Sequence, residues 1–107
     1  MRIAFMSEEN RGLDSIVSQR FGRAKYMIIV DVENGEVKNI KAELNPGGQA
    51  ASGAGIKAVQ KLVDEGVEAV VAGAFGPNAM TALENIGIKF YQLQGIRVRE
   101  ALGKLSL

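Results

Sequence analysis

The sequence predicts an α/β fold in which a mixed sheet of five strands lies between helices. Two observations predict it. Apolar residues first recur with the spacing of strands, up to about residue 44, and then alternate between short apolar runs and helical spacing. The expected order is three strands, then helix, strand, helix, strand and helix. The chain has 107 residues, the length of one domain, which we place at residues 1–107.

The first two strands are separated by the longest irregular stretch of the chain. Residues 2–6, apolar after Arg2, predict a short strand. Residues 26–32 form a nearly continuous apolar run, which is typical of a strand covered on both faces. Residues 7–25 show no sustained period, and we expect at most a short helix there, around residues 13–17.

A hairpin connects the second strand to the third. Asn34-Gly35 is a strong signal for a two-residue turn. Apolar and polar residues alternate in the strand that follows, at residues 37–44, so we expect it to be half exposed. Its apolar residues are expected on one face: Ile40, Ala42 and Leu44.

Helical spacing begins after the third strand. We expect Ser52 to cap the first helix and Gly66 to end it. The apolar face of this helix is expected to consist of Ile56, Val59, Leu62 and Val63. A buried strand follows at residues 67–72.

The remaining elements repeat this alternation. Pro77 begins a second helix and Gly87 ends it, and residues 88–93 form the fifth strand. The second helix has an apolar stripe at Met80, Leu83 and Ile86, and the last helix has one at Val98, Ala101, Leu102 and Leu105.

This order of elements favours a ribonuclease-H-like topology. The three-layer fold would have strand order 3-2-1-4-5, with strand two antiparallel to the others and helices on both faces of the sheet. Four strands would then point to one edge, where ligands bind in open α/β sheets. The loops at this edge are residues 7–25, 45–52, 73–78 and 94–97.

The composition excludes several kinds of function. The chain has no cysteine and no histidine, so it offers no thiolate nucleophile, no cysteine-ligated cluster and no Ser-His-Asp triad. A net charge of +1 gives no general attraction to nucleic acid or to an anionic membrane. The short apolar stretch at the N-terminus is not typical of a signal peptide or a membrane span, so we expect a cytoplasmic protein.

Glycines are concentrated in two of the edge loops. In residues 73–78, Gly73 and Gly76 lie between a buried strand and a helix, where backbone amides could meet an anion. The alternative is a tight turn that needs positive φ. In residues 47–55, Gly53 and Gly55 fall in the first helical turn, which indicates close approach by a ligand or by another backbone segment. The alternative is a mobile loop packed against a neighbouring helix.

Arginines and one carboxylate complete the set of candidate residues. Arg20 and Arg23 lie close together in the first long loop and suit an oxyanion, although surface salt bridges are the commoner fate of arginine. Arg97 could reach the same edge. Asp31 lies inside an apolar strand and is either a functional carboxylate or a local ion-pair partner. The first strand has no carboxylate, which argues against two-metal nuclease chemistry.

Several segments resemble one known family. The sequence Phe21-Gly22-Arg23-Ala24, the Ser52-Gly53-Ala54-Gly55 helix start and the Gly76-Pro77-Asn78 segment are similar to those of the dinitrogenase iron–molybdenum cofactor biosynthesis proteins. This family includes NifX, NafY and the C-terminal part of NifB. The resemblance extends over essentially the whole chain.

The resemblance implies binding or carriage of an iron–molybdenum–sulfur cluster or its precursor without catalysis. Many family members have a histidine where this chain has Ser52, and this chain has no imidazole or thiolate at all. An anionic cluster would therefore be held by outer-sphere contacts or by weak oxygen or thioether ligands. The residues implied for this site are Arg20, Arg23, Gln49, Ser52, Gly53, Gly55, Gly73, Gly76 and Asn78.

Three functions remain open at the level of the sequence. The first is a non-enzymatic carrier of a metal–sulfur cluster, which would act with a protein partner in cofactor assembly. The second is a regulatory or interaction module that binds a partner protein or a small anion at the same loops. The third is a hydrolase or nuclease, which is supported only by analogy of fold.

Overall fold

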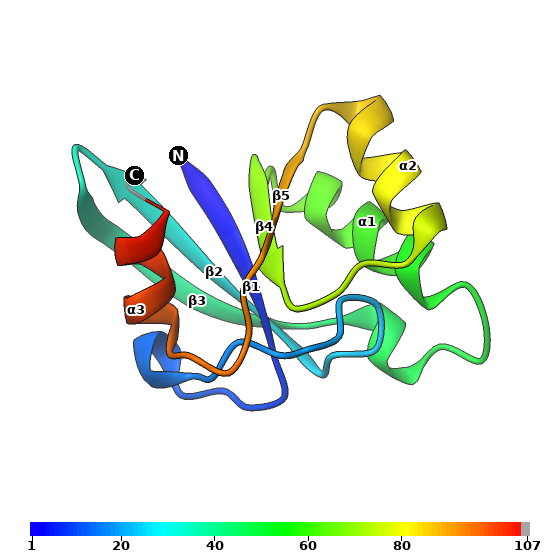
Figure 1. The fold of residues 1–107 in the computed structure, drawn as a ribbon, viewed down its shortest axis with the longest axis horizontal. Helices are drawn as coiled ribbons and strands as arrows, with labels where there is room; N and C mark the ends of the chain where they lie inside the picture. Colours follow the sequence, from blue (N-terminus) through cyan, green and yellow to red (C-terminus); the bar gives the residue numbers. More distant parts are fainter. Residues whose placement is uncertain (106–107) are drawn as a thin grey trace.

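The computed structural model describes residues 1–105 and has the expected order of strands and helices (Figure 1). The strands are β1 (Arg2–Ser7), β2 (Tyr26–Glu33), β3 (Glu36–Leu44), β4 (Ala69–Ala72) and β5 (Lys89–Gln92). The helices are α1 (Ala54–Asp64), α2 (Pro77–Ile86) and α3 (Val98–Lys104), and there are two short 3-10 turns, η1 (Gly12–Asp14) and η2 (Pro46–Gln49).

The five strands form one mixed sheet in the order β3-β2-β1-β4-β5, which confirms the predicted topology. Strand β2 is antiparallel to both of its neighbours, whereas β1, β4 and β5 run parallel. Strands β1, β3, β4 and β5 therefore end at the same edge of the sheet. We call this edge the rim, and the loops that leave it build the candidate site.

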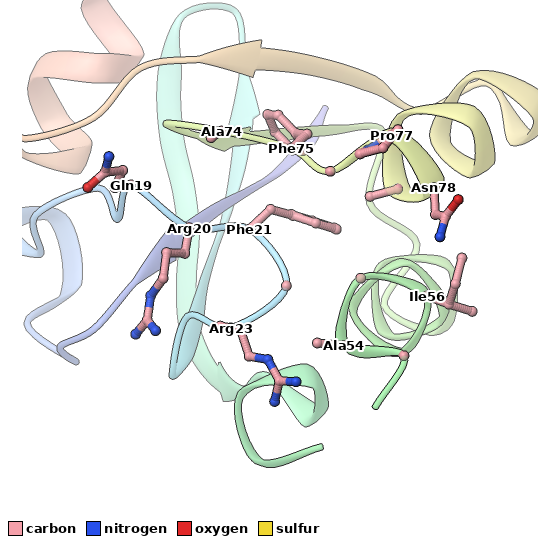
Figure 2. A pocket seen from close by; sticks show the side chains of 15 residues that line it. Gln19, Arg20, Phe21, Arg23, Ala54, Ile56, Ala74, Phe75, Pro77 and Asn78 are labelled. Carbon is pink, nitrogen blue, oxygen red and sulfur yellow. The ribbon is translucent and has the colours of Figure 1, made fainter. Parts of the chain in front are cut away.

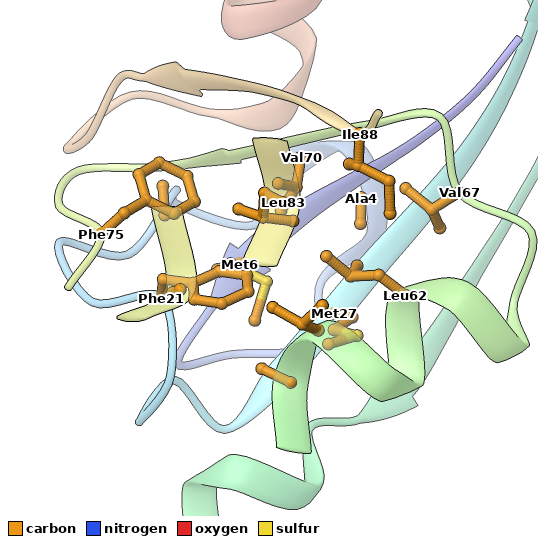
Figure 3. Close-up of a cluster of buried hydrophobic side chains, with 14 of the residues drawn as sticks. Ala4, Met6, Phe21, Met27, Leu62, Val67, Val70, Phe75, Leu83 and Ile88 are labelled. Carbon is orange, nitrogen blue, oxygen red and sulfur yellow. The ribbon is translucent and has the colours of Figure 1, made fainter. Parts of the chain in front are cut away.

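Helices cover both faces of the sheet, as predicted. Side chains of β1 alternate between two hydrophobic clusters, because successive residues of a strand point to opposite faces. Ala4 and Met6 lie in the cluster beneath α1 and α2 (Figure 3), whereas Ile3 and Phe5 lie in the cluster beneath α3. All four are fully buried, and they fix the sheet that carries the rim loops.

The helices are short, and each buries a single apolar stripe. Ala58, Val59 and Leu62 form the buried side of α1, and Ala79 and Leu83 form that of α2. Within residues 1–105, no helix has the length and apolarity needed to cross a bilayer.

Two local predictions are wrong. Gly53, with φ of 66°, caps α1 instead of Ser52, whose side chain makes no capping bond. The 3-10 turn η1 ends at Asp14, and Ile16 and Val17 form isolated bridges instead of continuing a helix. Ile40 and Ala42 pack against the cluster beneath α3, whereas Leu44, at the end of the edge strand β3, is 60% exposed.

Candidate functional site

An open groove of about 840 Å³ lies at the rim, and we call it the rim groove. Three segments surround it: the end of the first long loop, the start of α1, and the connection from β4 into α2 (Figure 2). These segments are far apart in the sequence. The groove is lined by Gln19, Arg20, Phe21, Gly22, Arg23, Gly53, Ala54, Gly55, Ile56, Ala74, Phe75, Gly76, Pro77, Asn78 and Ala79.

Asn45 holds the loop that carries the two arginines. It is 2% exposed, and its side-chain amide donates to the carbonyl oxygens of Phe21, Gly22 and Ala24 at 3.2, 3.1 and 2.8 Å. Its side-chain oxygen accepts from the Gly47 amide at 3.1 Å. One buried side chain therefore joins the first long loop to the loop after β3.

Glycines allow these loops to pack backbone against backbone. A Cβ on Gly22 would lie 2.9 Å from the nitrogen of Gly55, and one on Gly47 would overlap the carbonyl oxygens of Gly22 and Ala54. The sequence predicted a close neighbour at Gly55, either a ligand or another backbone segment. The backbone at Gly22 is such a neighbour. Gly53 has a different reason, because its positive φ starts α1 and leaves its side-chain position open.

The glycines between β4 and α2 are not there for positive φ, so the tight-turn alternative is wrong in that form. Neither Gly73 nor Gly76 has positive φ. A Cβ on Gly73 would overlap the Gln94 side chain and would lie 2.8 Å from the Cα of Gln19. Gly73 is thus required by close packing beside the rim groove, and its amide donates to the carbonyl of Ser18 at 2.9 Å.

The N-termini of two helices converge on the rim groove. The first-turn amides of α1 (Ala54, Gly55 and Ile56) and of α2 (Asn78 and Ala79) meet no acceptor within residues 1–105. Neither helix has a capping side chain or an acidic residue in its first turn. The partial positive charge of each N-terminus is therefore not neutralised by any residue in the range 1–105.

The two arginines differ in their partners. Arg23 donates from Nη1 to the carbonyl of Ala50, a neutral acceptor, so its positive charge is not neutralised. Arg20 forms an ion pair with Glu8 at 3.1 Å and points away from α1 and α2 (Figure 2). The surface-salt-bridge alternative therefore applies to Arg20. No carboxylate is among the residues that line the groove, so its lining carries net positive charge.

Six of the nine predicted site residues line the groove, and three do not. The groove-lining six are Arg20, Arg23, Gly53, Gly55, Gly76 and Asn78. Gln49 and Ser52 are exposed outside the lining, and Gly73 packs behind it. Arg97 lies elsewhere on the rim, where its Nε is 3.9 Å from an Asp14 oxygen.

The sequence-based set of site residues missed the apolar wall and the residue that shapes the loop. Phe21 and Phe75 pack with ring centroids 5.0 Å apart, and Ile56 is 42% exposed at the start of α1. Both phenylalanines precede a glycine in a loop at the rim, and this pattern in the sequence could have indicated that they line the site. Asn45 offered no signal beyond a place before a proline, because its role depends on three distant carbonyls.

Asp31 belongs to a structural ion pair at the other end of the sheet. Its carboxylate accepts from Arg2 Nε at 2.8 Å, and this hydrogen bond lowers the pKa of Asp31. Hydrogen bonds from Lys41 and Lys61 likewise lower the pKa of Glu65. Within residues 1–105, no group of three or more carboxylates is placed to hold a metal ion.

Comparison with known proteins assigns the chain to a family. The family model described as dinitrogenase iron-molybdenum cofactor matches residues 1–106. The chain is 29% identical over 102 residues to the uncharacterised protein MJ0580 of Methanocaldococcus jannaschii, covering 95% of this chain and 82% of that protein.

Solved structures similar to this chain in both sequence and fold include two at 36% and 41% identity. The apo form of the orange protein from Desulfovibrio gigas has a TM-score of 0.88 and 36% identity, covering 98% of this chain and 86% of that one. The NMR structure of TM1290 from Thermotoga, described in connection with NifB and the DUF35 family, has a TM-score of 0.79 and 41% identity, with the same coverage. The chain belongs to the dinitrogenase iron–molybdenum cofactor family, as its loop motifs indicated.

Proposed function

We propose that this protein is a non-enzymatic binder or carrier of an anionic metal–sulfur cluster, an iron–molybdenum–sulfur cluster or its precursor, which it holds in the rim groove. One observation carries the proposal. The unpaired amides of two helix N-termini and the charge of Arg23 face a groove whose lining contains no carboxylate. Such an arrangement favours an anion at little cost in protein rearrangement.

The chemistry of the donors favours contacts to the outside of the cluster. The chain has no cysteine or histidine, so no thiolate or imidazole can ligate a metal ion. Backbone amides and guanidinium groups donate hydrogen bonds to anionic sulfur or oxygen instead. Gln49 and Ser52 could contact a cluster only beyond the present lining, whereas Asn78 is at the groove.

The apolar wall favours a sulfide-covered anion over a compact oxyanion. Phe21, Phe75 and Ile56 would be costly neighbours for a strongly hydrated anion, because burying its charge removes water that they cannot replace. A cluster spreads its charge over many polarisable sulfur atoms, and it loses less hydration on contact with these side chains.

Binding, rather than catalysis, is supported by the residue types in the groove. A general base or nucleophile would require a carboxylate, thiol, imidazole or activated amine, and none of these lines the groove. A carrier must also receive and release its cargo. The proposal therefore includes a protein partner in cofactor assembly, with both proteins in the cytoplasm.

Calorimetric titration with tetrathiomolybdate under anaerobic conditions tests the proposal. We expect saturable binding that Arg23→Ala weakens by about five- to tenfold, the loss expected for one charge-assisted contact in a partly exposed site. Arg11→Ala is the matched control, because Arg11 is exposed outside the groove and its loss changes the net charge equally. Equal weakening by both variants, or no saturable binding, would reject the proposal.

A further inference from the structure

The partner of Arg20 lies in a hollow next to the rim groove. Glu8, Ser18 and Arg20 line this second hollow, and Arg20 lines the groove as well. One carboxylate oxygen of Glu8 lies 3.1 Å from Arg20 Nη2, and the other accepts from the Ser18 hydroxyl at 2.7 Å. Ser18 is only 7% exposed, so it fixes the position of the carboxylate.

The backbone of Arg20 is held by hydrogen bonds, whereas its side chain is mostly exposed. The Arg20 amide donates to the Ser18 hydroxyl at 3.0 Å, and Arg20 forms a bridge with Ala74 across the groove floor. Its side chain is 58% exposed. A rotation about side-chain bonds would thus exchange Glu8 for a ligand in the groove without moving the loop.

We propose that Glu8 sets the anion affinity of the rim groove by competing with the ligand for Arg20. In the free protein Glu8 holds Arg20 away from the two helix N-termini, and on binding Arg20 leaves Glu8 and donates to the anion. The cost of breaking an exposed ion pair is small, so the exchange is readily reversible. This inference rests on the proposed function, because it concerns the same groove.

The two arginines would then have distinct roles. Arg23 has a neutral partner and supplies a constant positive charge, whereas Arg20 contributes only after it leaves Glu8. Such competition keeps affinity moderate, which suits a protein that must also release its cargo.

A double-mutant cycle with tetrathiomolybdate as the probe tests this competition. The four proteins are the unaltered chain, Glu8→Gln, Arg20→Ala and the double variant. Glutamine keeps an oxygen that accepts from Ser18, so the hollow is preserved. We expect Glu8→Gln to tighten binding about threefold when Arg20 is present, and by a clearly smaller factor in the Arg20→Ala background.

Equal tightening in both backgrounds would overturn the inference, because Glu8 would then act only through its charge. No binding by any of the four proteins would overturn the proposed function and this inference together. Glu9→Gln is the matched control, since it removes the same charge from the neighbouring position and should tighten binding less than Glu8→Gln does.

A side-chain NMR signal provides a second measurement that does not depend on affinity. The Arg20 ¹⁵Nε–¹Hε signal, identified by its loss in Arg20→Ala, should shift when the probe saturates the unaltered chain. An Arg20 signal that stays in place at saturation, while the groove amides shift, would overturn the exchange and leave the groove as the binding site.

Discussion

Asn45 illustrates how much of the rim groove depends on a single residue. It is buried among three carbonyls of the first long loop, and it also accepts from the Gly47 amide. A buried polar group that loses its partner costs about 1–3 kcal/mol. We therefore expect Asn45→Ala to lower the free energy of unfolding by about 2–3 kcal/mol, as measured by urea denaturation.

The control for this prediction is Asn85→Ala, on the exposed side of α2. Alanine is the better helix former, so this variant should be neutral or more stable by a few tenths of a kcal/mol, roughly. Similar losses in both variants would contradict the role assigned to Asn45.

Two glycines of the same chain should respond to alanine in opposite ways. At Gly22 a new Cβ would press on the Gly55 backbone at 2.9 Å, and backbone cannot move aside as a side chain can. At Gly103, inside α3, a Cβ meets nothing within 4 Å. We expect Gly22→Ala to destabilise by about 2 kcal/mol or more and Gly103→Ala to stabilise by about 0.5–1 kcal/mol.

Thermal or urea unfolding measures both variants. A neutral Gly22→Ala would mean that the loop and the start of α1 are not in close contact. The sequence shows glycines in these loops but not why each is needed. Positive φ at Gly53 and close backbone contact at Gly22 both require glycine, so the sequence alone cannot distinguish them.

At the scale of elements, one substitution at the start of α2 is expected to change stability and anion affinity in opposite directions. Asn78 is in the first turn of α2, where a carboxylate interacts favourably with the helix dipole. Asn78→Asp should therefore keep stability or raise it by up to about 1 kcal/mol. The same carboxylate would repel an anion in the groove, so affinity for tetrathiomolybdate should fall about fivefold or more.

Asn85→Asp is the control, because it adds the same charge in the last turn of α2, away from the groove. It should leave affinity nearly unchanged and lower stability slightly. An Asn78→Asp variant that binds as tightly as the unaltered chain would show that the helix N-termini do not face the ligand.

The elements themselves were largely predictable, and their ends were not. Apolar spacing located all five strands and three helices, because those residues form the two clusters that sandwich the sheet. The prediction failed where tertiary contacts decide the backbone: at Ser52, where a glycine in the left-handed region starts the helix instead, and at Ile16–Val17, where bridges replace a helix.

At the scale of the whole molecule, the two ends of the sheet have different electrostatic character. Away from the rim, Arg2 pairs with Asp31 at 2.8 Å, and Glu65 pairs with Lys41 and Lys61 at 2.6 and 3.0 Å. At the rim groove, Arg23 has no acidic partner among residues 1–105, and no carboxylate is among the residues that line the groove. Carboxylates therefore form ion pairs away from the rim, whereas none is among the residues that line the rim groove.

This arrangement predicts how stability depends on pH. The pKa values of Asp31 and Glu65 are lower in the folded protein than in the unfolded chain. The unfolded chain therefore binds more protons in the acid range, and lowering the pH favours unfolding. The contribution is fully present above the ordinary carboxyl pKa of about 4 and disappears as the pH falls through the lowered values.

Unfolding free energies measured from pH 7 down to pH 2 test this dependence. Glu65→Gln should reduce the loss of stability on acidification, whereas Glu84→Gln, at an exposed position on α2, should leave the slope unchanged. An acid slope that is the same in Glu65→Gln and the unaltered chain would contradict the role of this ion-pair cluster.

The candidate site was predictable in its location but only partly in its members. The topology placed four loops at one rim, and six of the nine predicted residues line the groove there. Gln49 and Ser52 lie outside it, because the close packing of Gly22 and Gly47 against α1 sets which face of the second glycine loop is inside. The partners of Arg20 and Arg23 are set by the three-dimensional packing of the loops, so they could not be predicted from the spacing of residues in the sequence.

An anaerobic ¹⁵N–¹H NMR titration with tetrathiomolybdate tests the central claim most directly, because each backbone amide reports on its own surroundings. We expect saturable shifts at residues 20–24 and at the first-turn amides of α1 and α2, with the β2–β3 hairpin unaffected. Absence of saturable shifts, or shifts spread equally over both ends of the sheet, would contradict the rim groove as an anion site.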